Sequence, residues 1–300
     1  MGGILRQLLR HTQKICNRTA ILLVFFLLLF IGAAESVPDR LMQKKQNITT
    51  QETVIKREIQ AGVVLDLRER LFDTGIISKE LEVVYLTPEE EAEKVYTFLQ
   101  GPRAFSESLP WSGDWCQKIV RHNSFGGFGC GLCCMANIYS TLTPYECSPW
   151  DMYEYATQAT LYYPTKKSGA IGWDDMKQTL ASVGFTCENC SKPATYEEFQ
   201  EQMTHTDSAI VLVSSGEDDT FWKDTAGHYV NIWLYQKDSD MVFLAEPGDP
   251  ENNRTWIPLR YVYDALKTVS QYQYLTVTAY AEESNQWKWN GIDDVWNGKF

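Results

Sequence analysis

The apolar residues follow helical spacing through the middle of the chain and form short runs or alternate nearer its end. Spacing near 3.6 residues, with capping residues and breakers, predicts helices over residues 88–100, 131–142, 149–159, 173–183 and 196–203. Short β-rich runs predict strands over residues 209–214, 229–235, 241–245 and 274–280, with a further helix over residues 258–267. Helices followed by mostly antiparallel strands indicate an α+β fold.

Particular residues mark the ends of several predicted helices. Thr87 is suited to cap the first helix, Pro88 fits its first turn, and a Gly-Pro pair at residues 101–102 should end it. Ser148 is placed to cap the helix over residues 149–159, and Gly184 should end the helix over residues 173–183.

An uncharged stretch, residues 19–34, follows a basic leader near the start of the chain. A membrane-spanning helix needs roughly 20 apolar residues, so this segment is of marginal length. It is equally compatible with an uncleaved membrane anchor and with a signal peptide cleaved after Ala34. Either alternative places the rest of the chain outside the cytoplasm, since basic residues precede the segment. We expect a leader or anchor over residues 1–34, a stalk or N-terminal extension over residues 35–109 and a folded domain over residues 110–300.

Charge argues against one class of partner. The 300 residues carry a formal charge of −12, and the first 34 contain four basic residues and no acid, which leaves −16 on the rest. A body this acidic is repelled by phosphate backbones, so we expect no nucleic-acid partner. Apolar residues make up 44% of the chain, which excludes wholesale disorder.

A glycine-rich approach to a predicted helix is the most informative feature of the chain. Cys130 lies between Gly129 and Gly131, directly before the apolar helix over residues 131–142. The positive end of a helix favours the thiolate of a cysteine placed there, and the helix N–H groups can stabilise an oxyanion. A nucleophilic cysteine of a hydrolase needs both. Buried structural thiols are the alternative, and we expect that role for Cys133 and Cys134.

A nucleophilic thiol needs a base, and a base needs a group that orients it. His228 opens an apolar strand, where a rigid edge can project it into a cleft. We expect His122 and His205 to be exposed to solvent. Glu246 follows the next strand and could hold the imidazole of His228, and Asp249 is a close rival.

These residues carry a resemblance to a known family. Gly-Cys-Gly before a Met-Ala helix, Gly-His-Tyr-Val opening a strand and an acid-Pro pair after the next strand resemble the papain-like peptidases of cysteine peptidase family 39. More narrowly, they resemble the stand-alone family 39-like domains of bacterial envelope proteins, relatives of the bacteriocin-leader peptidases.

The resemblance covers about residues 110–281, and it implies several properties. It implies a papain-like fold, with the nucleophile at the start of a central helix packed on an antiparallel sheet. It also implies Cys130 as nucleophile, His228 as base, a peptide or protein substrate and no cofactor. The family usually has Asp before the Pro, where this chain has Glu246, so the orienting residue stays open. The family's oxyanion Gln has one nearby candidate here, Gln117, 13 residues before the cysteine.

Three alternatives remain beside the hydrolase. The Cys130–Cys133 and Cys187–Cys190 pairs could form a four-thiolate zinc site. The second pair could instead form a local disulfide outside the cell, with Cys130 as the thiol left over among the seven cysteines after the apolar segment. A catalytically inactive papain-like module could bind a peptide or a wall polymer. In that case the aromatic tail, with Trp287, Trp289 and Trp296, could serve binding, or it could pack against the core.

Overall fold

The computed structural model describes residues 86–299 except 166–168, and these residues belong to one compact unit that begins at Leu86. The expected leader and most of the expected extension lie outside the described residues. Within the described ranges, no helix has both the length and the apolar composition that crossing a membrane requires. Residues 86–109 contribute buried side chains to the unit, including Phe98 and Leu99.

The unit combines short and medium helices with one large sheet, which confirms the α+β class. The helices are α5 (Pro88–Ala92), α6 (Pro102–Ser106), α7 (Phe125–Phe128), α8 (Cys130–Leu142), α9 (Pro149–Ala159), α10 (Trp173–Ser182), α11 (Tyr196–Met203) and α12 (Leu259–Ala265), with a 3₁₀ turn η1 (Asp114–Gln117). The strands are β1 (Ile119–Val120), β2 (Asn123–Ser124), β3 (Val183–Cys190), β4 (Ser208–Val213), β5 (His228–Gln236), β6 (Met241–Ala245), β7 (Thr255–Pro258) and β8 (Tyr274–Asn285).

The large sheet is antiparallel throughout. Its six strands run in the order β3-β8-β4-β5-β6-β7, while β1 and β2 pair with each other alone. Strands β5 and β6 are neighbours, with Asn231 opposite Ala245 and Trp233 opposite Phe243. The two strands therefore end side by side at one edge of the fold, which places the start of β5 next to the end of β6.

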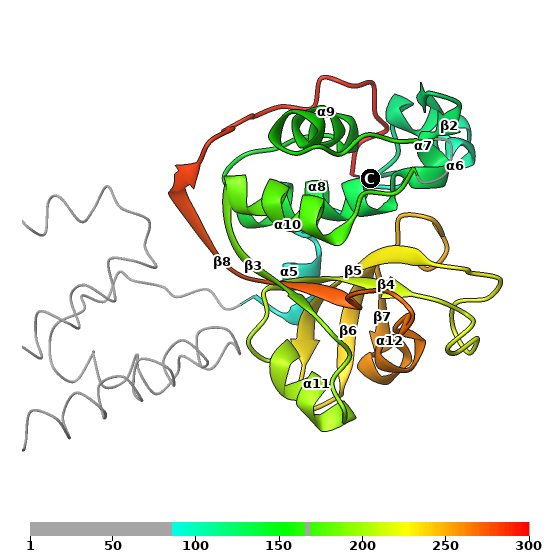
Figure 1. Ribbon diagram of the computed structural model, residues 1–300, viewed down its shortest axis with the longest axis vertical. Helices are drawn as coiled ribbons and strands as arrows, with labels where there is room; N and C mark the ends of the chain where they lie inside the picture. The colour runs from blue at the N-terminus through cyan, green and yellow to red at the C-terminus, as the bar shows by residue number, and fades with distance from the viewer. Residues whose placement is uncertain (1–85, 166–168, 300) are drawn as a thin grey trace, which may run out of the picture. The chain divides into compact units, whose positions relative to one another are not determined.

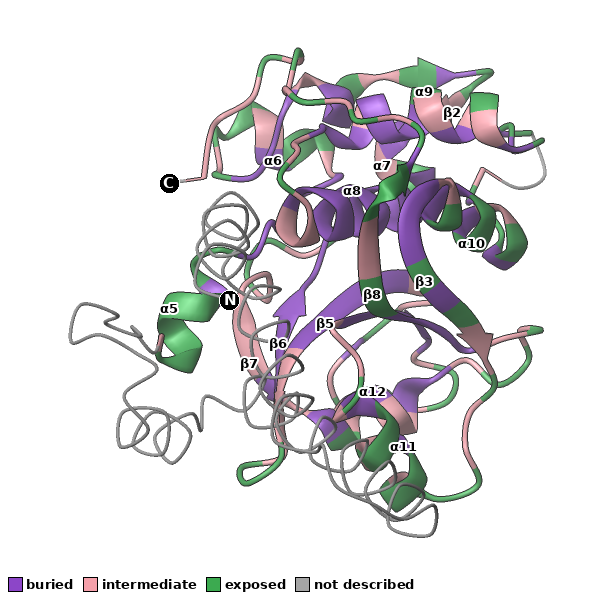
Figure 2. Cartoon of the chain, turned by 90° about the vertical axis from the view of Figure 1, so that its left-hand side faces the viewer, coloured by how far each residue is buried: buried purple, intermediate pink, exposed green. Residues whose placement is uncertain are grey.

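Helix α8 is the centre of the structure. It contacts α9 and α10 on one side and β4 and β5 on the other, and Figure 1 shows it between the outer helices and the sheet. Eleven of its 13 residues are buried, so the helix appears almost wholly purple in Figure 2. A helix that is apolar on every face must be covered on every face, and this composition explains its central place.

The opposite face of the sheet is covered by α11 and α12 (Figure 1). Alternate residues of β5 divide between the two cores: Tyr229 and Trp233 pack on the α8 side, while Val230 and Ile232 pack on the α11 side. This is the two-residue period expected of a strand that is buried on both faces.

The first predicted helix is shorter than its sequence indicates. Thr87 caps it with a capping box through Glu90, as expected, but α5 ends at Ala92 instead of near Gln100. Residues 93–94 form a turn and residues 95–100 form neither helix nor strand, because their apolar side chains are buried and backbone carbonyls in this stretch accept hydrogen bonds from another part of the chain. Arg254 donates to the Ala92 and Val95 carbonyls. Tertiary packing thus overrides local helix propensity here.

The other predicted helices agree with the structure more closely. Ser148 caps α9 through a capping box with Asp151. Helix α10 ends at Ser182 and passes directly into β3, a strand that the sequence analysis does not contain, and Gly184 lies inside that strand with φ of 93°. The strand β7 was missed as well. The tail after β8 packs on the helices: Trp287 stacks on Tyr155 with ring centroids 4.5 Å apart.

Candidate active site

Cys130 is the first residue of α8, and the turn before it is tightly packed. The short helix α7 precedes it, with Gly129 alone between the two helices. A Cβ at Gly129 would lie 2.3 Å from the ring of the buried Phe125, so only glycine fits there. Cys130 itself is 8% exposed. The glycine therefore leaves room for the Phe125 ring beside the turn that joins α7 to Cys130 at the start of α8.

His228 is the first residue of β5, and it meets both other members of the candidate triad. Its Nε2 is hydrogen-bonded to Oε1 of Glu246, which directly follows β6. The Cys130 side chain also lies close enough to His228 to help raise the pKa of this histidine. The structure thus brings together three residues that are separated by up to 116 positions in the sequence. The order is thiol, imidazole, carboxylate.

Glu246 is held firmly in place. Its side chain is 2% exposed, and Oε2 accepts a hydrogen bond of 2.8 Å from Nε1 of Trp222, while Oε1 accepts one of 2.9 Å from the Gly248 N–H. Its own N–H donates to Oδ1 of Asn253 at 3.0 Å. A buried carboxylate needs such donors, because it has lost its water. These donors hold the Glu246 carboxylate in the position where it bonds to the His228 ring.

The imidazole ring of His228 is also closely packed. A Cβ at Gly248 would lie 3.0 Å from both Cε1 and Nε2 of His228. The glycine after the acid-Pro pair therefore leaves room for the ring, and the ring has little freedom to turn.

The charge of His228 depends on its two partners. Burial disfavours the imidazolium, but the Glu246 carboxylate and the Cys130 side chain favour it, and together they raise the pKa of His228 well above its usual value of 6.5. An imidazolium beside a thiol favours the ionised sulfur. The site therefore places a positively charged imidazole beside the Cys130 side chain.

The remaining six described thiols have other environments. Burial raises the pKa of Cys116 to about 12 and of Cys187 to about 11, and burial also raises the pKa values of the other four thiols, Cys133, Cys134, Cys147 and Cys190. A protonated, buried thiol reacts poorly. Cys133 and Cys134 are fully buried on α8, as expected of structural residues.

The rival candidates for base and orienting acid lie elsewhere. His122 and His205 are exposed, as expected. Asp249 ends up in a turn, where its two carboxylate oxygens accept hydrogen bonds from the Glu251 N–H and the Asn252 side chain. The structure therefore pairs Glu246 with His228. Gln117, the last residue of η1, has an exposed side chain, and its role as oxyanion donor stays a prediction.

The four cysteines of the alternative zinc site do not assemble. Within the described residues, no three or more His, Cys, Asp or Glu side chains are grouped so that they could bind a metal ion. The predicted local disulfide is also wrong, because Cys187 and Cys190 are free. The two residues are three apart on β3, so they project from opposite faces of the strand.

A buried pair of asparagines, which the sequence analysis missed, joins the two elements that carry Cys130 and His228. Nδ2 of Asn137 on α8 donates to Oδ1 of Asn231 on β5 at 3.1 Å, and Oδ1 of Asn137 accepts from the Phe98 N–H at 2.8 Å. Both asparagines are fully buried. A hydrogen bond between two buried side chains favours the arrangement that forms it, so this bond links α8 to β5.

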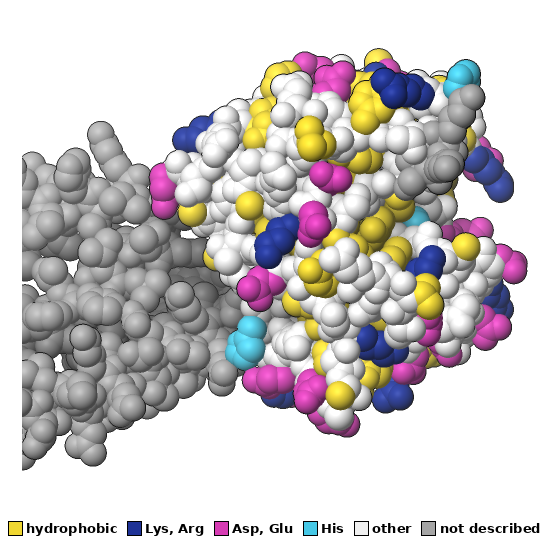
Figure 3. All heavy atoms as spheres, viewed as in Figure 1, with side chains coloured by type: hydrophobic (Ala, Val, Ile, Leu, Met, Phe, Trp, Pro, Cys, Tyr) yellow, Lys and Arg dark blue, Asp and Glu magenta, His cyan; other side chains and the backbone are white. Residues whose placement is uncertain are grey.

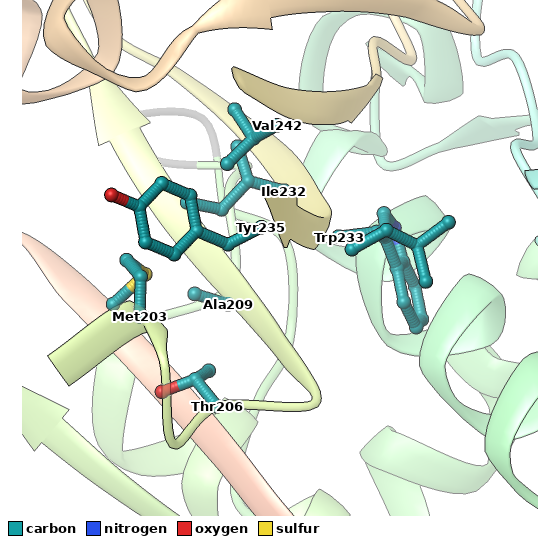
Figure 4. Close-up of a pocket in the computed structure, with 8 residues that line it drawn as sticks. Met203, Thr206, Ala209, Ile232, Trp233, Tyr235 and Val242 are labelled. Atoms are coloured by element: carbon teal, nitrogen blue, oxygen red, sulfur yellow. The ribbon is translucent and has the colours of Figure 1, made fainter. Parts of the chain in front are cut away.

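The surface around the site is partly apolar. Figure 3 shows hydrophobic side chains along the junction between the outer helices and the sheet. A separate hollow, shown in Figure 4, lies along β5 beyond Ile232 and has a volume of about 10 Å³. This volume holds about one water molecule at most, so the hollow is not a substrate site.

Comparison with known proteins adds no relative: no protein-family model and no curated protein matches the chain. The arrangement of Cys130, His228 and Glu246 is therefore the basis for a functional proposal.

Proposed function

We propose that this protein is a papain-like thiol hydrolase that cleaves peptide bonds with Cys130, His228 and Glu246. The observation that carries the proposal is the position of His228, which is hydrogen-bonded to the Glu246 carboxylate and lies beside the Cys130 side chain. Nucleophile, base and orienting acid in this order are the requirements of acyl transfer through a covalent intermediate. A central helix that begins at the cysteine and packs on an antiparallel sheet agrees with a papain-like fold.

In the first half of the reaction, Sγ of Cys130 attacks the carbonyl carbon of the scissile amide. A carbon–sulfur bond forms, and the carbonyl oxygen becomes an oxyanion. The imidazolium of His228 then gives its proton to the amide nitrogen, the carbon–nitrogen bond breaks, and the amine leaves. The product on the protein is a thioester of Cys130, with neutral His228 beside it.

In the second half, water attacks the thioester carbon. His228 takes a proton from the water, the carbon–sulfur bond breaks, and the acid product leaves with Cys130 regenerated as thiolate beside an imidazolium. Glu246 keeps the ring oriented and stabilises its positive charge throughout, without taking the proton itself. The start of α8 supplies positive potential at the oxyanion, and we assign the additional donor to Gln117.

We further propose that the substrate is a peptide or protein outside the cytoplasm. The support is the sequence alone: the basic leader and the apolar residues 19–34 are typical of a signal peptide or an anchor that would hold the enzyme at the membrane.

Hydrolysis of a diverse peptide library tests the activity. Wild-type protein should generate new N-termini that mass spectrometry detects, Cys130→Ser should generate none, and Cys190→Ser should retain the activity. Equal cleavage by wild type and Cys130→Ser would contradict the proposal. Binding of library peptides without cleavage would favour the inactive module instead.

A further inference from the structure

A second thiol lies one helical turn after the candidate nucleophile. Cys130 begins α8, and Cys133 follows it by three residues on the same helix. Residues three apart on a helix are neighbours, with about 5–6 Å between their Cβ atoms. Cys130 is 8% exposed, whereas Cys133 is fully buried, and both thiols are free. The structure therefore places a partly accessible thiol beside one that is shielded from solvent.

Two further cysteines lie near this pair, but each is less suited to bond with Cys130. Cys116 comes from η1, and its Sγ donates a hydrogen bond of 3.2 Å to a backbone carbonyl. Burial and the neighbouring thiols raise the pKa of Cys134, and the Glu246 carboxylate raises it further, which disfavours the thiolate that attacks another sulfur. Burial also raises the pKa of Cys133, but the other groups that raise it are thiols alone, those of Cys116 and Cys130. Cys133 is therefore the favoured partner.

The place of Cys130 at the end of the helix allows the two sulfurs to approach each other. A disulfide needs Cβ atoms about 3.5–4.5 Å apart, which is closer than helix neighbours normally lie. The interior of a helix resists this change, but the first N–H groups of a helix make no hydrogen bonds within it, so its first turn shifts more easily. Gly129 and Gly131 flank Cys130, and glycine accepts backbone angles that other residues avoid. The first turn of α8 can therefore tighten around a bond between the two cysteines.

We propose that Cys130 and Cys133 form a reversible disulfide when a hydroperoxide oxidises Cys130, and that this bond switches the hydrolase off until a thiol reduces it. The effect on activity rests on the proposed function, because the bond removes the nucleophile of that reaction. The disulfide itself can form whether or not the protein hydrolyses peptides. Cysteines that sense oxidants are accessible and lie next to a second thiol, and this pair has that arrangement.

The first step consumes the hydroperoxide. Sγ of Cys130, as thiolate, attacks the terminal oxygen, the oxygen–oxygen bond breaks, and the leaving oxygen takes a proton from the imidazolium of His228. Cys130 is then a sulfenic acid, and the hydroperoxide has been reduced to an alcohol or, from hydrogen peroxide, to water. In the second step Sγ of Cys133 attacks the Cys130 sulfur, the sulfur–oxygen bond breaks, and the hydroxide leaves as water with the Cys133 proton.

Burial makes Cys133 a poor nucleophile toward reagents in solution, but Cys130 is its neighbour. A group held beside its reaction partner acts at a high effective concentration, up to about 10⁵–10⁸ M for well-oriented pairs. The alternative fate of the sulfenic acid is further oxidation to a sulfinic acid, which thiols do not reverse. Capture by Cys133 therefore keeps the nucleophile recoverable.

Mass spectrometry of oxidised protein tests whether the bond forms. Wild-type protein is reduced, treated with limiting hydrogen peroxide and then alkylated with N-ethylmaleimide in urea. Cys130 and Cys133 should escape alkylation together and become alkylated only after reduction with dithiothreitol, while Cys134 should be alkylated in both cases. A bond from Cys130 to Cys134 or Cys116, oxidation of Cys130 directly to sulfinic acid, or a Cys130 that stays reduced in excess peroxide would overturn the proposal.

Two matched variants test the switch in activity. Cys133→Ala and Cys134→Ala each remove one fully buried thiol from α8, and both should hydrolyse peptides before oxidation. After excess peroxide and then dithiothreitol, wild type and Cys134→Ala should regain most of their rate. Cys133→Ala should regain several-fold less, with Cys130 present as sulfinic acid. Equal recovery in all three proteins would contradict the switch.

The two experiments separate this proposal from the proposed function. Absence of hydrolysis by untreated wild-type protein would count against the hydrolase alone, because the mass spectra still decide whether Cys130 and Cys133 join. Hydrolysis by wild type without a Cys130–Cys133 bond after peroxide would leave the hydrolase standing and overturn the switch.

Discussion

Nε2 of His228 and Oε1 of Glu246 are hydrogen-bonded across the adjoining ends of two neighbouring strands, β5 and β6. The carboxylate is almost completely buried, and it also accepts hydrogen bonds from the Trp222 indole and the Gly248 N–H. The base of the proposed enzyme is therefore held by a rigid frame. A flexible loop would not provide the same orientation.

Replacing each carboxylate with its amide should show which of the two candidate acids, Glu246 or Asp249, orients His228. Glu246→Gln should lower the rate of peptide hydrolysis by about 10²–10⁴-fold, because the ring loses its orientation and the charge that stabilises it. Asp249→Asn should stay within a few-fold of wild type, since Asp249 only closes a turn. Rates from one fluorogenic peptide are sufficient. A large loss in Asp249→Asn with a small one in Glu246→Gln would reverse the assignment.

Removing the indole donor should disturb the same carboxylate more mildly. Trp222→Phe keeps the aromatic ring but deletes the N–H that bonds to Glu246 at 2.8 Å. A buried acceptor that loses its donor costs about 1–3 kcal/mol in the free energy of unfolding. We also expect the hydrolysis rate to fall about tenfold as the carboxylate shifts. Trp256→Phe, on β7, is the control; equal effects of both variants on rate would remove Trp222 from the positioning of Glu246.

The pH dependence of stability should report the charge of His228. The pKa of His228 is raised in the folded state, so its pairing contributes stability that is fully present below about pH 6.5 and is lost as the pH rises through the folded pKa. The free energy of unfolding, measured with urea, should therefore fall as the pH rises above about 6.5. In His228→Gln this part of the fall should be absent. Identical pH profiles for the two proteins would show that the pKa of His228 is not raised in the folded state.

Two glycine substitutions compare a crowded position with an open one. Gly129→Ala should lower the free energy of unfolding by about 1–3 kcal/mol, because the new methyl group would overlap the Phe125 ring. Gly101→Ala places the same methyl group where nothing lies within 4 Å and should be nearly neutral. Chemical denaturation measures both. Similar losses in the two variants would mean that crowding at Gly129 is not the cause.

The residues that could be predicted from the sequence are those with strong local signals. Ser148 and the periodic residues after it predicted α9, and the apolar run after Gly129 predicted the helix α8, which begins at Cys130. The residues that were missed depend on contacts between distant segments. The end of α5 at Ala92 involves contacts with Arg254, more than 150 positions later. Trp222 has no sequence signal for its role, because its partner Glu246 is reached only once β5 and β6 have paired.

The rate at which Cys130 is alkylated tests the central claim most directly. Wild-type protein is treated with limiting iodoacetamide over a range of pH, and peptide mass spectrometry measures the reaction of each cysteine. Cys130 should react faster than a model thiol at neutral pH and faster than the six other described cysteines, and His228→Ala should remove this advantage. Reaction of Cys130 no faster than the model thiol, or an unchanged rate in His228→Ala, would contradict the account.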